Sequence, residues 1–246
     1  AYGVNAEGFL DYDAIEEQAL EFRPHVIVAG ASAYPRVIDW ARFREIADKV
    51  DAFLVVDMAH YSGLIAGGAY PNPVPYADVV TSTTHKTLRG PRGGIILWND
   101  EFFTKKINSA IFPGTQGGPL MHVIAAKAQC FIEASTPEYK DYAHAVVRNA
   151  KAMCDVLRQR ELTVQTGGTD SHIILMDLSS SKYSGREAAD LLEANGITVN
   201  KNGVPNDPRS FVETSGIRIG TAAETTRGHD EMWFRKLAHK IADILE

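Results

Sequence analysis

Short apolar runs alternate with amphipathic stretches in the first half of the chain, a pattern typical of β–α–β units around a mostly parallel sheet. Asp13 and Glu16 have the spacing of a capping box before a helix that ends at Phe22. Apolar residues from Trp40 to Val50 recur at helical spacing and predict a second helix. Four apolar runs predict strands: 25–30 (HVIVAG), 52–57 (AFLVVD), 77–81 (ADVVT) and 94–98 (GIILW).

The pattern changes after Leu120, where a long helical region reaches about Ser135 and Pro137 is expected to break or kink it. A second helix is expected over 138–160. The elements predicted beyond it are a strand at 172–178, a helix at 185–195, a short strand near 198, a strand at 216–220 and a helix from 229. We therefore expect two domains, 1–136 with the mostly parallel sheet and 137–246 as a smaller α+β domain.

Composition narrows the class of protein. With 246 residues, 45% hydrophobic and 23% charged, the chain is long and apolar enough for a buried core, which excludes a disordered or collagen-like chain. Its net charge of −6 argues against nucleic-acid binding, and no apolar run approaches the ~18 residues that span a membrane. Two cysteines without CxxC spacing argue against a disulfide framework or a zinc site and favour the reducing cytoplasm.

An acidic residue ends one of the predicted strands, in VVDMAH at Val55 to His60. Ligands bind beyond the carboxyl ends of strands in open parallel sheets, so Asp57 lies where a site is expected. Position alone is equally consistent with Asp57 capping the following turn.

A lysine follows the next predicted strand, in TSTTHKTLRGPRGG at Thr81 to Gly94. Lys86 at such a junction is suited to Schiff-base formation with a carbonyl cofactor, which needs a neutral amine. Desolvation and the cations Arg89 and Arg92 would lower its pKa. Three glycines would let backbone approach a phosphate or a neighbouring chain closely: Gly90, Gly93 and Gly94. Many structural loops share this mixture, so the pattern alone leaves both interpretations open.

Together the two segments indicate a pyridoxal 5′-phosphate enzyme, which needs a Schiff-base lysine and an acid for the pyridinium nitrogen. The stretch from VDMAHYSGLIAGGAYPNPVPYADVV to TSTTHKTLRGPRGG resembles serine hydroxymethyltransferase. The resemblance continues through FPGTQGGPLMHVIAAKA and VNKNGVPNDPRS to TSGIRIGT. It implies the aspartate-aminotransferase fold (fold type I) and the interconversion of serine and glycine, with transfer of a one-carbon unit to tetrahydrofolate.

The resemblance also implies roles for single residues around the cofactor. Lys86 matches the lysine that binds the cofactor covalently, and Asp57 matches the aspartate that keeps the pyridine nitrogen protonated. Ser32 and His60 match residues that approach the phenolic oxygen of the cofactor. Ser32 as a turn residue, or His60 as a hydrogen-bonded structural histidine, are the alternatives.

Further matches concern the substrates. Thr83 and His85 match polar neighbours of the lysine, with His85 tied to substrate handling. Arg218 matches the arginine that binds the substrate carboxylate, a role that suits a planar fork. Gly117 and Gly118 match glycines that reach the cofactor phosphate of the opposite subunit, which implies a homodimer or a dimer of dimers. The alternatives are a structural, hydrogen-bonded His85 and an ion pair between Arg218 and a structural acid such as Glu213.

Two departures from the family pattern stand out. The loop 202–210 resembles a folate-contacting segment, and the folate contacts are expected at Ser210, Phe211 and Val212. The chain reads RSFVETSG here, where the family often has a serine–proline–phenylalanine run. Family members also carry about a third of their length before the segment matching Tyr2. We therefore expect this chain to be a piece of a longer enzyme and to bind the cofactor weakly by itself. Rival interpretations are a related lyase without folate, such as a threonine aldolase, and a non-catalytic piece that retains the fold.

Overall fold

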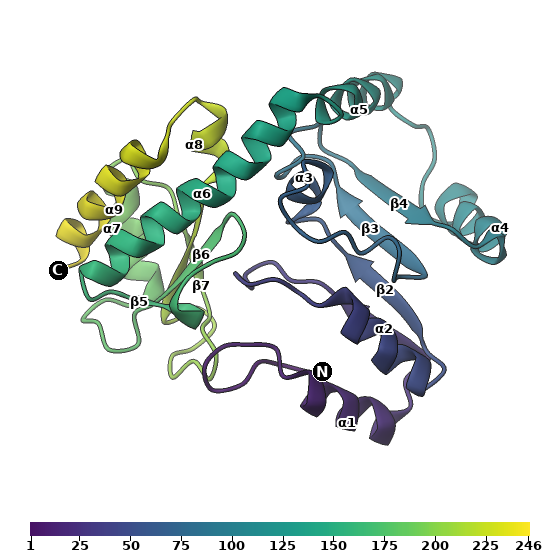
Figure 1. Cartoon of the computed structure of the whole chain (residues 1–246), viewed down its shortest axis with the longest axis horizontal. Helices are drawn as coiled ribbons and strands as arrows, with labels where there is room; N and C mark the ends of the chain where they lie inside the picture. The colour runs from purple at the N-terminus through teal and green to yellow at the C-terminus, as the bar shows by residue number, and fades with distance from the viewer.

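The computed structural model describes residues 1–246, which form two β-sheets with their own helices (Figure 1). The first sheet has the strand order β1-β2-β3-β4. Strands β1, β2 and β3 are parallel, and β4 is antiparallel to β3, so the sheet is mostly parallel as predicted. The strand bounds are β1 Val26–Ala29, β2 Phe53–Asp57, β3 Val79–Thr83 and β4 Gly94–Trp98.

Five helices belong to the first sheet, and together they form what we call the large lobe. They are α1 Tyr12–Phe22, α2 Trp40–Lys49, α3 Ser62–Ala66, α4 Thr104–Ser109 and α5 Met121–Ala134, with short 3-10 and π turns at Glu101–Phe103 and Ala110–Thr115. The expected capping by Asp13 is wrong, because Asp11 accepts the hydrogen bond of the Ala14 N–H at 3.1 Å.

The first sheet is covered on one face only. Ile27, Leu54 and Val80 point into the core beside α2 and α3 and are nearly inaccessible. On the opposite face Val26, Val28 and Phe53 are 46%, 59% and 44% exposed. We call this second side the uncovered face; it is unusual, because parallel strands normally have both faces buried.

The second sheet is antiparallel, with the strand order β5-β6-β8-β7, and with its helices it forms the small lobe. Its strands are β5 Thr163–Val164, β6 Ile173–Asp177, β7 Asn200–Asn202 and β8 Gly216–Gly220. The helices are α7 Gly185–Ala194, α8 Ala222–Thr226 and α9 Glu231–Leu245, with a 3-10 turn at Gln165–Gly167.

Helix α6 (Pro137–Gln159) runs along both lobes (Figure 1). Pro137 does separate two helices, as expected: it begins α6, whose N-cap Thr136 accepts from the Tyr139 N–H at 3.3 Å. Residues of α6 up to Val146 pack in the core of the large lobe, and those from Ala150 pack in the core of the small lobe. The division into domains at residue 136 stays a prediction, because the two cores meet within this helix.

Two further observations bear on the classes excluded from composition. None of the helices combines the length and the hydrophobicity that crossing a membrane requires. No three acidic, histidine or cysteine side chains are grouped so that they could hold a metal ion, and Cys130 and Cys154 are free and buried.

Candidate active site

A cavity of about 500 Å³ lies where the two lobes meet. The large lobe lines it with His60 from the segment after β2, and with His85 and Lys86 from the loop after β3. The small lobe contributes His172, just before β6, and Arg218 in β8. The carboxyl ends of the parallel strands therefore face a cationic strand of the other sheet, and four of the predicted site residues share one cavity.

Thr87, the residue after Lys86, anchors this loop through its hydroxyl and through its carbonyl oxygen. The Thr87 hydroxyl donates to the carbonyl oxygen of His60 at 2.8 Å and accepts from the Gly63 N–H at 3.0 Å. Its carbonyl oxygen accepts two phenol hydrogen bonds from α6, from Tyr139 at 2.9 Å and Tyr142 at 3.2 Å. These bonds fix the backbone next to Lys86, so the amine emerges from a rigid support.

The glycines of this loop serve packing within the chain. A Cβ on Gly90 would lie 2.7 Å from Cys130 Sγ, and one on Gly93 would lie 2.7 Å from Cε of Lys127. Both neighbours belong to α5. The expected approach of these two glycines to a phosphate or another chain is replaced here by the approach of the chain's own helix.

Burial lowers the pKa of the Lys86 amine, with Arg218 adding to the effect and Asp57 opposing it. Arg89 and Arg92 were expected to lower the pKa of Lys86, but the arginine that does so is Arg218 from the other lobe. Arg89 instead lies over the ring of Tyr142, 4.2 Å from its centroid. A lowered pKa increases the fraction of neutral amine, which is the nucleophilic form.

Asp57 ends β2 on the uncovered face, and its side chain is exposed. Its Oδ1 accepts from the Ala59 N–H at 3.0 Å, so it does cap the turn, while Oδ2 has no hydrogen-bond partner. Backbone packs closely here: a Cβ on Gly30, at φ +136°, would lie 2.3 Å from the Asp57 carbonyl oxygen. The carboxylate thus lies outside the residues that line the cavity, close enough to Lys86 to raise the pKa of its amine, with one oxygen free.

Two histidines stack at the boundary between the lobes. The rings of His60 and His172 lie 5.7 Å apart and are inclined by 15°. Burial, together with the charges of Lys86 and Arg218, lowers the pKa of His60 to about 4. Burial also lowers the pKa of His172 to about 3. Both imidazoles are therefore neutral at pH 7. His172 was missed in the sequence, where it reads as the first residue of an apolar strand.

Arg218 has no acidic partner. Its Nη1 donates to the carbonyl oxygen of Ser32 at 2.6 Å, and its Nη2 donates to Oδ1 of Asn200 at 3.0 Å. The alternative partner Glu213 pairs with Arg186 at 3.5 Å instead. Burial lowers the pKa of Arg218. A partly buried guanidinium without a carboxylate is an appropriate anchor for the carboxylate of a ligand.

Unpartnered polar atoms gather at this place. Six buried side-chain nitrogen or oxygen atoms of the chain have no hydrogen-bond partner. Three of them belong to residues that line the cavity, namely Nδ1 of His60, His85 and His172. A fourth is Oγ1 of Thr83, which ends β3 before the loop of Lys86 and does not line the cavity. The alternative that His60 and His85 are fully hydrogen-bonded fails for these nitrogens. Buried polar atoms normally have partners, so this cluster fits a polar ligand such as pyridoxal 5′-phosphate.

The structure leaves other predicted residues outside the cavity. Ser32 is exposed and contributes its carbonyl oxygen to Arg218 rather than its hydroxyl. Gly117 and Gly118 lie in an exposed segment, where an added Cβ would meet nothing within 4 Å. Three exposed residues form the turn before β8, namely Ser210, Phe211 and Val212, and Lys201 Nζ donates to the Val212 carbonyl oxygen. The roles of these residues stay predictions.

Comparison with known proteins bears on this arrangement. The family model of serine hydroxymethyltransferase matches residues 1–241. The chain belongs to the serine hydroxymethyltransferase family. It is 58% identical to serine hydroxymethyltransferases of Legionella pneumophila (strain Lens) and Psychrobacter cryohalolentis, aligned over 100% of this chain and 59% of each relative. The enzyme of the Wolbachia strain wRi is also 58% identical, with 58% of its length covered.

The chain thus spans about 59% of the length of the relatives it matches. Family membership confirms fold type I for the α/β architecture around the first sheet. The basic and imidazole side chains that line the cavity are one lysine, three arginines and three histidines.

Proposed function

We propose that this chain carries the lysine and the carboxylate-binding arginine of a pyridoxal 5′-phosphate enzyme that interconverts serine and glycine with tetrahydrofolate. One observation supports this most strongly: Lys86, with a lowered pKa, and Arg218, without an acidic partner, line the same cavity. Pyridoxal 5′-phosphate supplies an electron sink for the bonds of the substrate α-carbon when it is bound.

Each protein group has a distinct task in this proposal. The neutral Lys86 amine would hold the cofactor through its carbonyl carbon, with release of water, and the free Oδ2 of Asp57 would keep a proton on the pyridine nitrogen. Arg218 binds the substrate carboxylate and orients the α-carbon. The neutral imidazole of His60 hydrogen-bonds without adding a third positive charge beside Lys86 and Arg218.

The assembly and the folate site belong to the proposal as well. We place Gly117 and Gly118 against a partner subunit, which their open, exposed surroundings support. Helix α5 next to them exposes Met121 by 67% and Ile132 by 64%, an apolar surface suited to a subunit interface. Folate contacts at Ser210 to Val212 and a cytoplasmic location complete the proposal.

The experiment that tests the proposal traps the cofactor on the chain. Pyridoxal 5′-phosphate is added, the adduct is reduced with borohydride, and the labelled peptide is mapped by mass spectrometry. We expect one label, at Lys86, and its loss in Lys86→Ala but not in Lys105→Ala. A label confined to Lys105 or Lys201 would contradict the assignment. Serine cleavage that needs no folate, in the protein extended to the length of its relatives, would favour an aldolase.

A further inference from the structure

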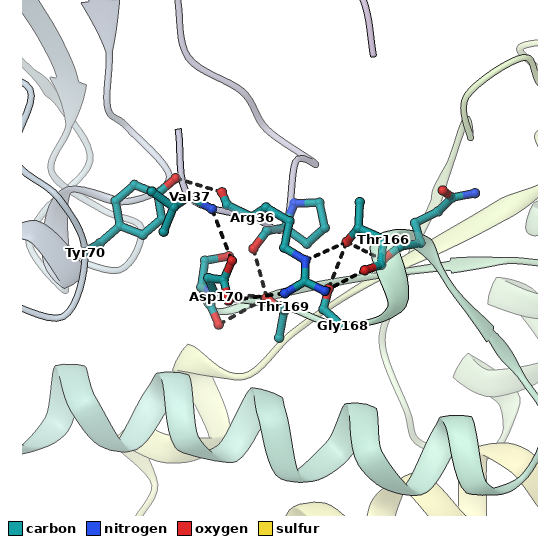
Figure 2. A network of polar contacts seen from close by, with 10 residues as sticks. Arg36, Val37, Tyr70, Thr166, Gly168, Thr169 and Asp170 are labelled. Atoms are coloured by element: carbon teal, nitrogen blue, oxygen red, sulfur yellow. Dashed lines mark hydrogen bonds and ion pairs between the residues drawn. The ribbon is translucent and has the colours of Figure 1, made fainter. Parts of the chain in front are cut away.

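A network of polar contacts joins the loop after β1 to the segment before β6, and so connects the two lobes (Figure 2). The guanidinium of Arg36, in the loop after β1, reaches the segment that precedes β6. Its Nε donates to Oγ1 of Thr166 at 2.9 Å, its Nη2 to the Thr166 carbonyl oxygen at 2.5 Å, and its Nη1 pairs with Oδ1 of Asp170 at 3.3 Å. We call the contact of 35–37 with 166–170 the interlobe clasp.

Backbone groups complete the interlobe clasp. The carbonyl oxygen of Pro35 accepts from the Asp170 N–H at 2.9 Å and from the Thr169 hydroxyl at 3.1 Å. Oδ2 of Asp170 accepts from the Val37 N–H at 3.4 Å. The side chains of Arg36 and Asp170 are only 23% and 34% exposed. The Asp170 carboxylate therefore binds both a side chain and the backbone of the other lobe, across 134 positions of sequence.

The same two segments carry groups of the site. Ser32, three residues before Pro35, accepts the 2.6 Å hydrogen bond from Arg218. His172 follows Asp170 by two residues and lines the cavity. A shift of 166–170 would therefore carry His172 with it, and a shift of 35–37 would disturb the Ser32 carbonyl oxygen that holds Arg218.

Aromatic rings join the interlobe clasp to the site by a second route. The Tyr70 hydroxyl donates to the carbonyl oxygen of Arg36 at 2.9 Å, and its ring stacks on Tyr61 at 4.5 Å and 7°. Tyr61 lies edge-on to His172 at 6.2 Å, and His172 stacks on His60. Tyr61 and Tyr70 are buried, so this row of rings packs closely between the interlobe clasp and His172.

We propose that Arg36 and Asp170 are positioning residues, which hold the small lobe at the separation where Arg218 and His172 face Lys86 across the cavity. Helix α6 joins the lobes along the chain, and the Arg218–Ser32 hydrogen bond and the stacked histidines bridge them at the cavity. The interlobe clasp adds a further set of contacts that bears on how far the cavity opens. This role, which rests on the function proposed above, makes the interlobe clasp a determinant of how well the site binds an amino-acid carboxylate.

The test measures the pKa of the Lys86 amine in the folded chain. Lysines are labelled competitively with acetic anhydride across a pH series, and the peptide of Lys86 is quantified by mass spectrometry. Asp170→Asn and Arg36→Gln remove the ion pair with side chains of similar shape. If the small lobe then retreats, Lys86 loses both the burial and the Arg218 charge that lower its pKa, so we expect its pKa to rise in both variants.

Direct electrostatics predicts a different result. Loss of the Asp170 charge alone would lower the pKa of Lys86, because a nearby anion favours the charged amine. A rise in Asp170→Asn therefore requires movement of the small lobe. An unchanged or lowered Lys86 pKa in Asp170→Asn overturns the proposal. The proposal also fails if Lys86 of the wild type is labelled over the same pH range as the exposed Lys151.

Arg42→Gln is the matched control, because Arg42 is 25% exposed and pairs with Glu16 at 2.7 Å within the large lobe. It should leave the Lys86 pKa unchanged. Arg36→Lys keeps the charge without the planar fork, so it should give a smaller rise and serves if Arg36→Gln fails to fold. The labelling needs neither cofactor nor turnover. A rise in the variants therefore stands even if cofactor trapping on Lys86 fails, which would refute only the proposed function.

Discussion

The two stacked histidines show how single residues adapt to a cationic site. His60 and His172 lie close to Lys86 and Arg218, and a proton on either imidazole would add charge where none can be solvated. Both therefore stay neutral, and each keeps one buried nitrogen without a partner. The free energy of unfolding therefore depends on pH, because the folded chain holds both imidazoles in the neutral form.

The stability of the chain should fall as the pH is lowered from about 6.5 toward 4. The unfolded histidines bind protons below about 6.5, whereas the folded pKa values are about 4 and 3, so the unfolded state takes up more protons in this window. Each histidine contributes a slope of at most ~1.4 kcal/mol per pH unit. Urea unfolding between pH 6.5 and 5 measures it. His172→Gln should halve the slope, and the exposed His239→Gln should not; equal slopes in wild type and His172→Gln would contradict this.

Asp57→Asn should separate chemistry from stability. The amide oxygen can still accept from the Ala59 N–H, and the side chain is exposed, so unfolding should change by less than ~0.5 kcal/mol. Loss of the charge removes the group that holds the pyridine nitrogen protonated. We therefore expect moderately weaker cofactor binding and turnover lower by orders of magnitude, in the protein extended to the length of its relatives. Near-normal turnover at saturating cofactor would make Asp57 a turn cap only.

At the scale of elements, the site depends on how closely α3 packs on the loop of Lys86. A Cβ on Gly63 would lie 2.1 Å from the Thr87 carbonyl oxygen, and this atom also accepts the hydrogen bonds from α6. Backbone on both sides leaves no flexible side chain to yield. The identity of one helical glycine therefore decides whether helix, loop and α6 fit together.

Gly63→Ala should destabilise the chain by roughly 1–3 kcal/mol, because the overlap must be relieved by moving backbone. Helix propensity alone predicts the opposite, a gain of up to ~1 kcal/mol. The sign of the change in urea unfolding thus distinguishes the two effects. Gly117→Ala, in open space, serves as the control and should change stability little. A stabilised Gly63→Ala variant would show that α3 does not press on the loop.

The elements differ in how far the sequence predicts them. The run FLVVD predicts a strand because it is short, apolar and rich in β-branched valine, although one face of this strand is exposed in the structure. Helix α3, with five residues and one turn, has no period to detect, and the antiparallel pairing of β4 depends on a loop path rather than on composition. The N-cap was expected at Asp13 from its spacing to Glu16, whereas the structure uses Asp11, two residues earlier.

The residues of the site also differ in how far the sequence predicts them. Lys86 and Asp57 stand out because charged residues at the ends of apolar strands are conspicuous, and the resemblance names the residues expected around them. His172 and the Arg36–Asp170 pair carry no local signal, since their significance arises from contacts made across the whole chain. Contacts of this kind follow from tertiary packing, which short sequence patterns do not encode.

For the molecule as a whole, the prominent feature is the uncovered face of the first sheet. Val26, Val28 and Phe53 together expose a continuous apolar strip beside β1, which is also an edge strand. Proteins normally cover or charge such edges, because free edges pair with other chains. The net charge of −6 opposes association only weakly at physiological ionic strength.

We expect the 246-residue chain to self-associate through the uncovered face, in a manner that depends on concentration and persists at high salt, because apolar contacts are not screened. Sedimentation velocity at several concentrations measures this. Val28→Lys places a charge at a residue that is 59% exposed, so it should shift the distribution toward smaller species without lowering the unfolding midpoint. Met232→Lys on α9, at a residue 61% exposed but in the small lobe, is the matched control and should leave association unchanged. Equal effects of the two substitutions would assign the association to general surface hydrophobicity, and a monomeric wild-type chain at all concentrations would show that the uncovered face is not adhesive.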